Sequence, residues 1–116
     1  MGTNKPDPTM NPPYMTIVQN NYCPKGQSNN NYVYLDDPSS AKSIDNSFYK
    51  QILSNKGILP IDQALALDGS TRWMVNLLAN STDFPSLFTQ ALVKLGRVEV
   101  LTGKRGEIRT NCRRTN

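Results

Sequence analysis

The stretch YLDDPSSAKSIDNSFY, residues 34–49, gathers carboxylates and small hydroxyls of the kind that bind hard metal ions. Calcium takes roughly six to eight oxygen ligands from carboxylates, hydroxyls and carbonyls. Part of such a shell could come from Asp37, Ser40, the carbonyl of Ser43, and Asp45. The spacing is not that of an EF-hand loop. The same residue types also form turns and cap helices, and the pattern alone favours capping over metal binding.

Two other polar positions could carry chemistry. Asp62 lies in the apolar run GILPIDQALAL, where a carboxylate needs a hydrogen-bond donor or a cation, unless it caps a helix that starts at Gln63. The residues leave these two interpretations open. Asn80 begins an Asn-Ser-Thr sequon, which matters if the chain enters the secretory pathway.

The composition excludes several catalytic classes. The chain has no histidine, so it holds no Ser-His or Cys-His pair, no histidine zinc site and no imidazole ligand for haem. Its two cysteines, Cys23 and Cys112, form no CxxC pair. They could bridge each other, stay free, or pair outside this chain.

The net charge of +4 is concentrated at the end of the chain. Residues 94–116 hold two acids, Glu99 and Glu107, and these bases: Lys94, Arg97, Lys104, Arg105, Arg109, Arg113 and Arg114. Such a segment is most often simply solvated, but it could also contact an anionic polymer. No aromatic residues alternate with the bases, which argues against nucleic acid as the partner. We also expect no membrane span and no signal peptide in this chain.

The apolar spacing predicts a mainly α-helical fold. Asn11 should cap a short helix with Pro12 in its first turn, and Asp45 should cap a second helix that stops at Gly57. The buried face of that second helix is expected to consist of Phe48, Tyr49, Ile52 and Leu53. The segment ILPIDQALAL, residues 58–67, is expected to be an apolar turn.

Two more helices should follow. The first ends near Asn80 and its apolar face consists of Trp73, Met74, Leu77 and Leu78. The second starts after Thr82 or Asp83 and ends at Gly96. The segment VEVLTGKRGEIR then predicts a short extended arm or hairpin.

Three stretches resemble one protein family: FYKQILSNKGILPIDQALALD, LLANSTDFPSLFTQALVKLG and VLTGKRGEIRTNCRRTN. They are similar to the C-terminal part of the class III peroxidases, the secretory haem peroxidases of plants. The resemblance extends from about Gly2 to Asn116. It implies helices of the proximal half of the haem peroxidase fold, in a partial domain covering residues 1–116. It also implies haem b, two structural calcium ions, hydrogen peroxide as oxidant and phenolic donors as substrates.

The resemblance assigns roles to single residues. It implies a proximal calcium site formed by Asp37, Ser40, Ser43 and Asp45, although the family's threonine ligand is missing and Asp36 replaces an apolar residue. Asp62 matches the aspartate that accepts a hydrogen bond from the axial histidine. Cys23 and Cys112 match half-cystines whose partners lie upstream, and Asn80 matches a glycosylated position.

The family's axial and distal histidines have no counterpart here, so we expect a fragment that lacks the N-terminal half of its domain. Alone, it should retain haem and calcium poorly, lack peroxidase turnover and expose apolar helix faces. Its location by resemblance is extracellular, in the cell wall or vacuole. The alternative is a non-catalytic module that binds calcium or an anionic polymer.

Overall fold

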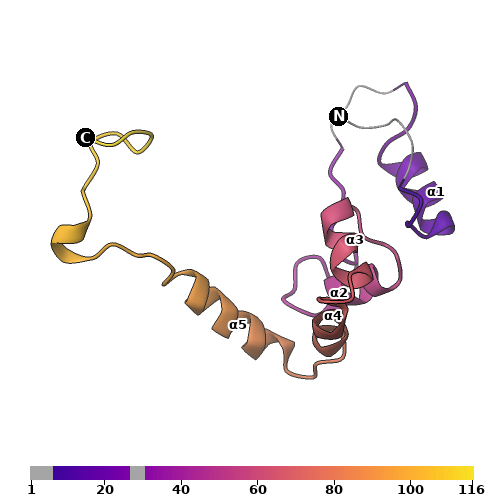
Figure 1. Ribbon diagram of the computed structural model, residues 1–116. Helices are drawn as coiled ribbons and strands as arrows, with labels where there is room; N and C mark the ends of the chain where they lie inside the picture. Colours follow the sequence, from indigo (N-terminus) through magenta and orange to yellow (C-terminus); the bar gives the residue numbers. More distant parts are fainter. Residues whose placement is uncertain (1–6, 27–30) are drawn as a thin grey trace. The chain divides into compact units, whose positions relative to one another are not determined.

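The computed structural model describes residues 7–26 and 31–116, and in these ranges it is helical without a β-strand (Figure 1). The elements in chain order are α1 (Pro12–Asn21), α2 (Ser47–Leu53), α3 (Pro60–Leu67), α4 (Arg72–Ala79), α5 (Phe84–Leu95) and a short 3-10 helix, η1 (Gly103–Arg105). This confirms the mainly α prediction. Contacts divide the chain into two compact units, Met1–Pro85 and Ser86–Asn116. Across the described ranges, no helix has the length and apolar character that crossing a membrane requires.

Helix α1 begins as its sequence predicts. The side-chain oxygen of Asn11 accepts a hydrogen bond from the backbone N–H of Tyr14 at 3.1 Å, and Pro12 opens the first turn, where its missing N–H costs nothing. The backbone N–H of Asn11 also donates to the carbonyl of Asn55 at 2.7 Å. This bond ties the start of α1 to the chain just after α2.

Helix α2 is shorter than predicted at both ends. Its N-cap is Asn46 rather than Asp45, although Asp45 still accepts the backbone N–H of Ser47 at 2.8 Å. The helix ends at Leu53, ahead of the expected stop at Gly57. The reason is Asn55, which adopts a left-handed conformation with a φ of 57°, a role that asparagine can take in place of glycine.

The segment predicted to be an apolar turn is the helix α3, and that prediction was wrong. Pro60 stands in its first turn, where a fixed φ favours the helix, and α3 packs against both α2 and α4. Asp62 lies inside the first turn, and the N-cap is Leu59, so Asp62 does not cap this helix.

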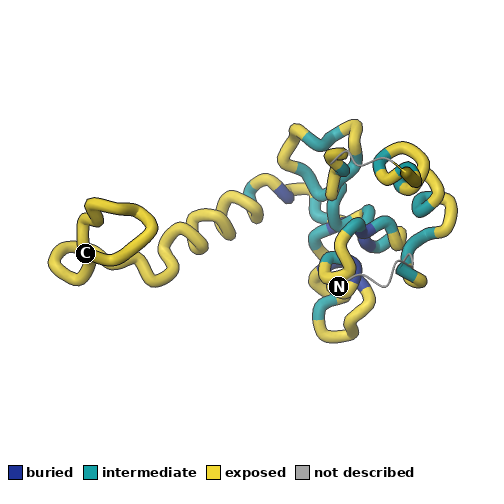
Figure 2. Tube along the Cα trace, turned by 90° about the horizontal axis from the view of Figure 1, so that it is seen from above, coloured by how far each residue is buried: buried dark blue, intermediate teal, exposed yellow. Residues whose placement is uncertain are grey.

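Helix α4 forms where it was predicted but buries a different face. Val75 and Ala79 are buried, whereas Trp73 is 60% exposed. Met74 and Leu77 are exposed too, so the predicted apolar face is not the packed one. The side of α4 that carries the smaller residues Val75 and Ala79 faces the core, where α2 and α3 pack against the helix. Figure 2 shows the few buried positions of this region in dark blue.

A small core holds α2, α3 and α4 together. Ile52, Ala66 and Val75 form its buried centre, with Phe48, Tyr49 and Leu53 packed against them, as predicted for α2. The rings of Tyr49 and Phe84 pack edge to face with 5.6 Å between their centroids, which adds an aromatic contact at the start of α5.

Helix α5 also confirms its prediction, and it ends where the N–H of Gly96 bonds to the carbonyl of Leu92 at 2.9 Å. Beyond it, residues 96–116 form an irregular arm that contains η1 and no β ladder, so the arm rather than the hairpin is observed. Every residue from 91 to 116 is exposed.

Candidate functional site

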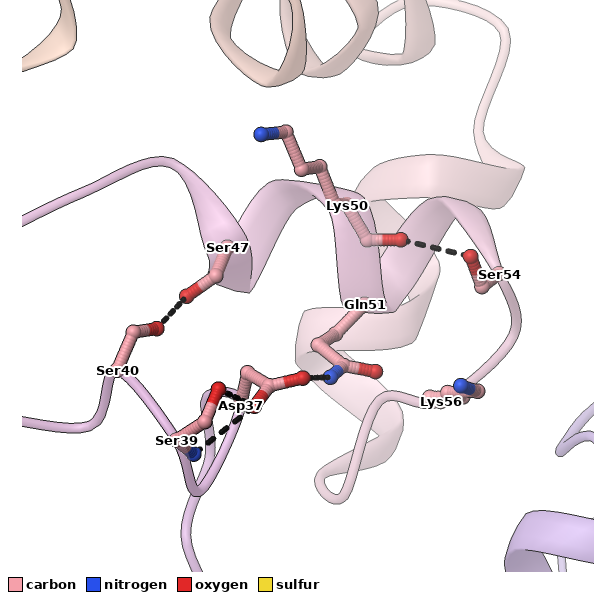
Figure 3. Close-up of a pocket in the computed structure, with 8 residues that line it drawn as sticks. All are labelled: Asp37, Ser39, Ser40, Ser47, Lys50, Gln51, Ser54 and Lys56. Atoms are coloured by element: carbon pink, nitrogen blue, oxygen red, sulfur yellow. Dashed lines mark hydrogen bonds between the residues drawn. The ribbon is translucent and has the colours of Figure 1, made fainter.

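The acidic loop before α2 is organised by side-chain hydrogen bonds, and Asp37 is its first centre. One carboxylate oxygen of Asp37 accepts the backbone N–H of Ser39 at 2.9 Å and its hydroxyl at 2.6 Å. The other accepts the side-chain amide of Gln51, on α2, at 3.0 Å (Figure 3). The hydrogen bonds from Ser39 are the largest cause of a lowered pKa for Asp37, because they stabilise the ionised carboxylate.

A second cluster joins the loop to the first turn of α2. The hydroxyls of Ser40 and Ser47 lie 2.9 Å apart, and the Ser47 hydroxyl also donates to the carboxylate of Asp36. Hydrogen bonds from the side chain and then the backbone of Ser47 lower the pKa of Asp45, with a smaller contribution from Ser40. The loop therefore brings Asp36, Ser40, Asp45 and Ser47 into one network.

An open pocket of about 340 Å³ lies beside this network. The residues that line it are Asp37, Ser39, Ser40, Ser47, Lys50, Gln51, Ser54 and Lys56 (Figure 3). One carboxylate, several hydroxyls and two lysines thus share one polar surface between the loop and α2.

The donors of the loop suit a hard cation in their chemistry, because carboxylates, hydroxyls and carbonyls are the ligands of calcium. Ser43, whose carbonyl was predicted as a ligand, is exposed, and its N–H bonds to the carbonyl of Ser40 at 2.8 Å. Within residues 7–26 and 31–116, no three His, Cys, Asp or Glu side chains are grouped so that they could hold a metal ion. The arrangement is that of turns and a helix start, built from residues that fit calcium by type.

Asp62 is partly buried on α3, and its carboxylate accepts no hydrogen bond from the residues that the structure describes. Its neighbour Gln63, for which no role was predicted, is only 3% exposed. The Gln63 side-chain oxygen accepts the N–H of Gly57 at 3.0 Å. Its amide donates to the carbonyl of Ile52 at 2.8 Å and to the Asn55 side chain at 3.2 Å. The sequence signal for the role of Gln63 was a single amide side chain within a mostly apolar run.

Asn46 is the other missed residue. Its side-chain amide donates to the carbonyls of Leu78 at 3.3 Å, Ala79 at 2.9 Å and Ser81 at 3.0 Å. The carbonyls of Leu78 and Ala79 lie at the C-terminal end of α4, where helix carbonyls lack partners within the helix, and Ser81 follows just after the C-cap. Asn46 therefore connects the start of α2 to the end of α4.

The remaining predicted positions lie at the surface. Asn80 is exposed at the C-cap of α4, and its side-chain amide donates to the carbonyl of Asn76 at 2.8 Å. Cys23 and Cys112 are both exposed and free, so they do not bridge each other in this structure.

Comparison with known proteins gives a consistent result. A family model described as Peroxidase matches residues 1–81. The chain is 44% identical over 116 residues to Peroxidase 57 of Arabidopsis thaliana. The aligned residues cover 99% of the chain and 35% of that protein. It is 38% identical over 117 residues to Peroxidase 15 of Ipomoea batatas, covering 98% of the chain and 35% of the relative.

A third relative, Peroxidase 5 of Vitis vinifera, is 38% identical over 116 residues, which cover 99% of the chain and 35% of that protein. The chain thus spans about a third of the length of the curated relatives it matches. The family model covers well over half of the chain, and the relatives are all plant peroxidases. The chain therefore belongs to the class III peroxidase family of plants.

Proposed function

We propose that this chain is one part of a haem peroxidase domain, and that the complete protein uses hydrogen peroxide to oxidise phenolic donors. The observation that carries the proposal is the family match along almost the whole chain, together with coverage of about a third of each relative. The activity, the phenolic substrates and the haem are those that the family resemblance implies for the complete protein.

The surface of α3 and α4 supports this proposal. Large apolar side chains are exposed on both helices, namely Ile61, Leu65, Leu67, Trp73, Met74 and Leu77. Exposed apolar surface on this scale is uncommon on a protein that is complete by itself. The rest of the domain would cover these faces in the full protein.

The chain's own residues do not fit haem. Haem in a peroxidase is held by an axial histidine, and this chain has none. Asp62 would take the role of accepting a hydrogen bond from such a histidine in the complete domain, and its partly buried carboxylate without a partner among the described residues is consistent with that. No catalytic step is therefore assigned to this chain alone.

A haem titration of the purified chain tests this division of roles. We expect no saturable one-to-one Soret band, with or without calcium, and no peroxide-dependent oxidation of a phenol. Ordinary turnover by the isolated chain would overturn the proposal, because another side chain would then have to ligate the iron. The same titration with a full-length relative is the positive control.

Calcium binding by the loop is the second part of the proposal. Asp37, Ser40, Ser43 and Asp45 would provide an incomplete shell, supported by the hard-donor chemistry of the loop and by its two lowered carboxyl pKa values. Such a shell should bind weakly. Isothermal titration with calcium chloride measures it, and identical heats for the wild type and an Asp45→Asn variant would contradict it.

Secretion follows from the same resemblance, with the extracellular space, cell wall or vacuole as its destination. Asn80 is exposed and accessible to glycosylation, and the thiols of Cys23 and Cys112 are exposed and available to pair with partners elsewhere in the complete protein. Expression of a full-length protein through a secretory pathway, followed by peptide mass spectrometry, would detect a glycan on Asn80. It would also detect the two disulfide pairings.

A second candidate function rests on the arm. The bases of residues 94–116 are all exposed, and the one ion pair among the described residues joins Arg109 to Glu107 at 3.0 Å. The arm could therefore bind an anionic cell-wall polymer. Retention of the chain on immobilised polygalacturonate should fall steeply with salt, because screening weakens contacts between exposed charges. Equal retention of a chain lacking residues 104–116 would exclude the arm.

A further inference from the structure

Two of the five tyrosines of the chain present their phenol rings to solvent, and both lie in one short segment ahead of the acidic loop. Tyr32 is 96% exposed and Tyr34 is 48% exposed. Within residues 7–26 and 31–116, neither side chain forms a hydrogen bond or a ring contact. Both phenols are therefore accessible to another molecule.

The other three tyrosines are partly buried. The ring of Tyr49 packs edge to face with Phe84, at 5.6 Å between centroids. The amino group of Lys56 lies 5.8 Å from the centre of the Tyr14 ring. Tyr22 is the C-cap residue of α1. These rings lie against the body of the chain, so a second large molecule cannot make full contact with them.

The segment that carries the exposed phenols is anchored at both ends. Before it, the side-chain amide of Asn31 donates a hydrogen bond to the carbonyl of Tyr22 at 2.9 Å. After it, the carboxylate of Asp36 accepts a hydrogen bond from the hydroxyl of Ser47 on α2. Residues 32–35 between these points form neither helix nor strand. The two phenols thus lie on a surface segment that the fold holds in place, the kind of position at which chemistry with another molecule is common.

We propose that Tyr32 and Tyr34 are themselves phenolic substrates, which a haem peroxidase of this family oxidises and couples to the same tyrosines of a second copy of the chain. The inference rests on the phenol oxidation proposed above and names a substrate for it. A tyrosine side chain is a phenol, so it carries the reacting group of that substrate class.

The coupling balances with hydrogen peroxide as the oxidant. The haem enzyme takes one electron and one proton from each of two tyrosine hydroxyls, and one molecule of peroxide is reduced to two molecules of water. The two phenoxyl radicals then form a carbon–carbon bond between ring positions next to the oxygens. Each of these carbons gives up its hydrogen as a proton and each oxygen takes one up, which restores both aromatic rings and yields a dityrosine.

Exposure decides which tyrosines can take part in this reaction. The new bond joins two rings directly, so each ring must be able to contact a ring of the other copy. Tyr32 and Tyr34 meet that requirement, whereas the partly buried rings do not. The expected product is a covalent dimer joined through residues 32–34.

The test mixes the full chain with hydrogen peroxide and an active, haem-loaded full-length relative. We expect dityrosine fluorescence and a covalent dimer on a reducing gel, where any disulfide through Cys23 or Cys112 would be broken. A Tyr32→Phe, Tyr34→Phe double variant should lose most of both signals. Phenylalanine keeps each ring and removes only the hydroxyl, and circular dichroism would check that the helix content is unchanged.

A Tyr14→Phe, Tyr22→Phe double variant is the matched control, because it also removes two phenol hydroxyls but from partly buried rings. It should keep most of the fluorescence and most of the dimer. Peptide mass spectrometry of the wild-type dimer should find the bond at Tyr32 or Tyr34. Equal losses in the two double variants would overturn the inference, because the site would then not be selective.

Oxidation of a small phenol by the same relative, measured in parallel, separates the inference from the proposed function. If the relative oxidises the small phenol but the wild-type chain forms no dityrosine, the inference is overturned and the proposed function stands. If the chain forms dityrosine with haem and peroxide in the absence of the relative, the proposed division of roles fails. The two tyrosines would then still be supported as the site of coupling.

Discussion

The buried amide of Gln63 offers the sharpest test of how α2 and α3 are joined. Gln63→Glu keeps the shape of the side chain and keeps an oxygen facing the N–H of Gly57. It removes the N–H groups that serve the carbonyl of Ile52 at 2.8 Å and the side-chain oxygen of Asn55 at 3.2 Å. At neutral pH the variant therefore places a carboxylate oxygen against two other oxygens.

The magnitude follows from the burial of the site. Gln63 is 3% exposed, so water cannot replace the lost donors easily. Each lost hydrogen bond costs about 0.5–1.5 kcal/mol, so the two together lower the free energy of unfolding by about 1–3 kcal/mol, and the buried carboxylate adds to this loss. This is a large share of the stability of a small domain. Gln90→Glu is the control, since Gln90 is exposed and its side-chain amide donates only a long hydrogen bond, 3.4 Å, to the hydroxyl of Ser86.

The loss should depend on pH with a defined sign. A buried carboxyl that faces carbonyl oxygens has a raised pKa in the folded state, because the ionised form is disfavoured there. The variant should therefore regain stability as the pH falls toward the ordinary glutamate pKa of about 4.3, where the protonated acid donates again, and lose it as the pH rises through the folded value.

Urea unfolding followed by far-ultraviolet circular dichroism, at several pH values, measures both effects. Equal losses for the Gln63 and Gln90 variants at neutral pH would refute the reasoning. So would a loss at Gln63 that does not shrink in acid.

Three further predictions follow from single contacts. Asn46→Ala should lower the free energy of unfolding by about 1–3 kcal/mol, because it leaves carbonyls at the end of α4 without a donor; urea unfolding measures this, and a change below about 0.5 kcal/mol would contradict it. Gly57→Ala should also destabilise, since a Cβ there would lie 2.9 Å from the Gln63 oxygen; an unchanged thermal midpoint would show that the site can relax. Asp68 should titrate below its ordinary pKa because the Ser70 hydroxyl and N–H bond to it, so its contribution to stability is present at neutral pH and is lost as the pH falls through that lowered value; carbon NMR should show the pKa rising in Ser70→Ala.

The sequence predicted what local chemistry decides. The cap of α1 at Asn11 and the end of α5 at Gly96 depend on neighbours within a few residues, and both were predicted correctly. The turn character of the loop is equally local, because Asp37 and Asp45 each bond to the residue two positions ahead.

Features that depend on distant residues were not predicted. Helix α3 was taken for a turn because its stability comes from packing on α2 and α4 rather than from its own caps. The packed side of α4 was predicted wrongly because large apolar residues, such as Trp73, face away from the small core. In the candidate site, the contact between Gln51 and Asp37 spans 14 residues and had no local signal.

The bonds from Asn46 to the end of α4 also bear on the order of folding. They span 32 to 35 residues, and α2, α3 and α4, which they enclose, are consecutive and pack on one another. Because α2, α3 and α4 follow one another in the chain, the loops that their packing closes are short, and such a helical unit folds fast compared with proteins that must pair distant strands. During synthesis the unit can assemble once Ser81 has left the ribosome.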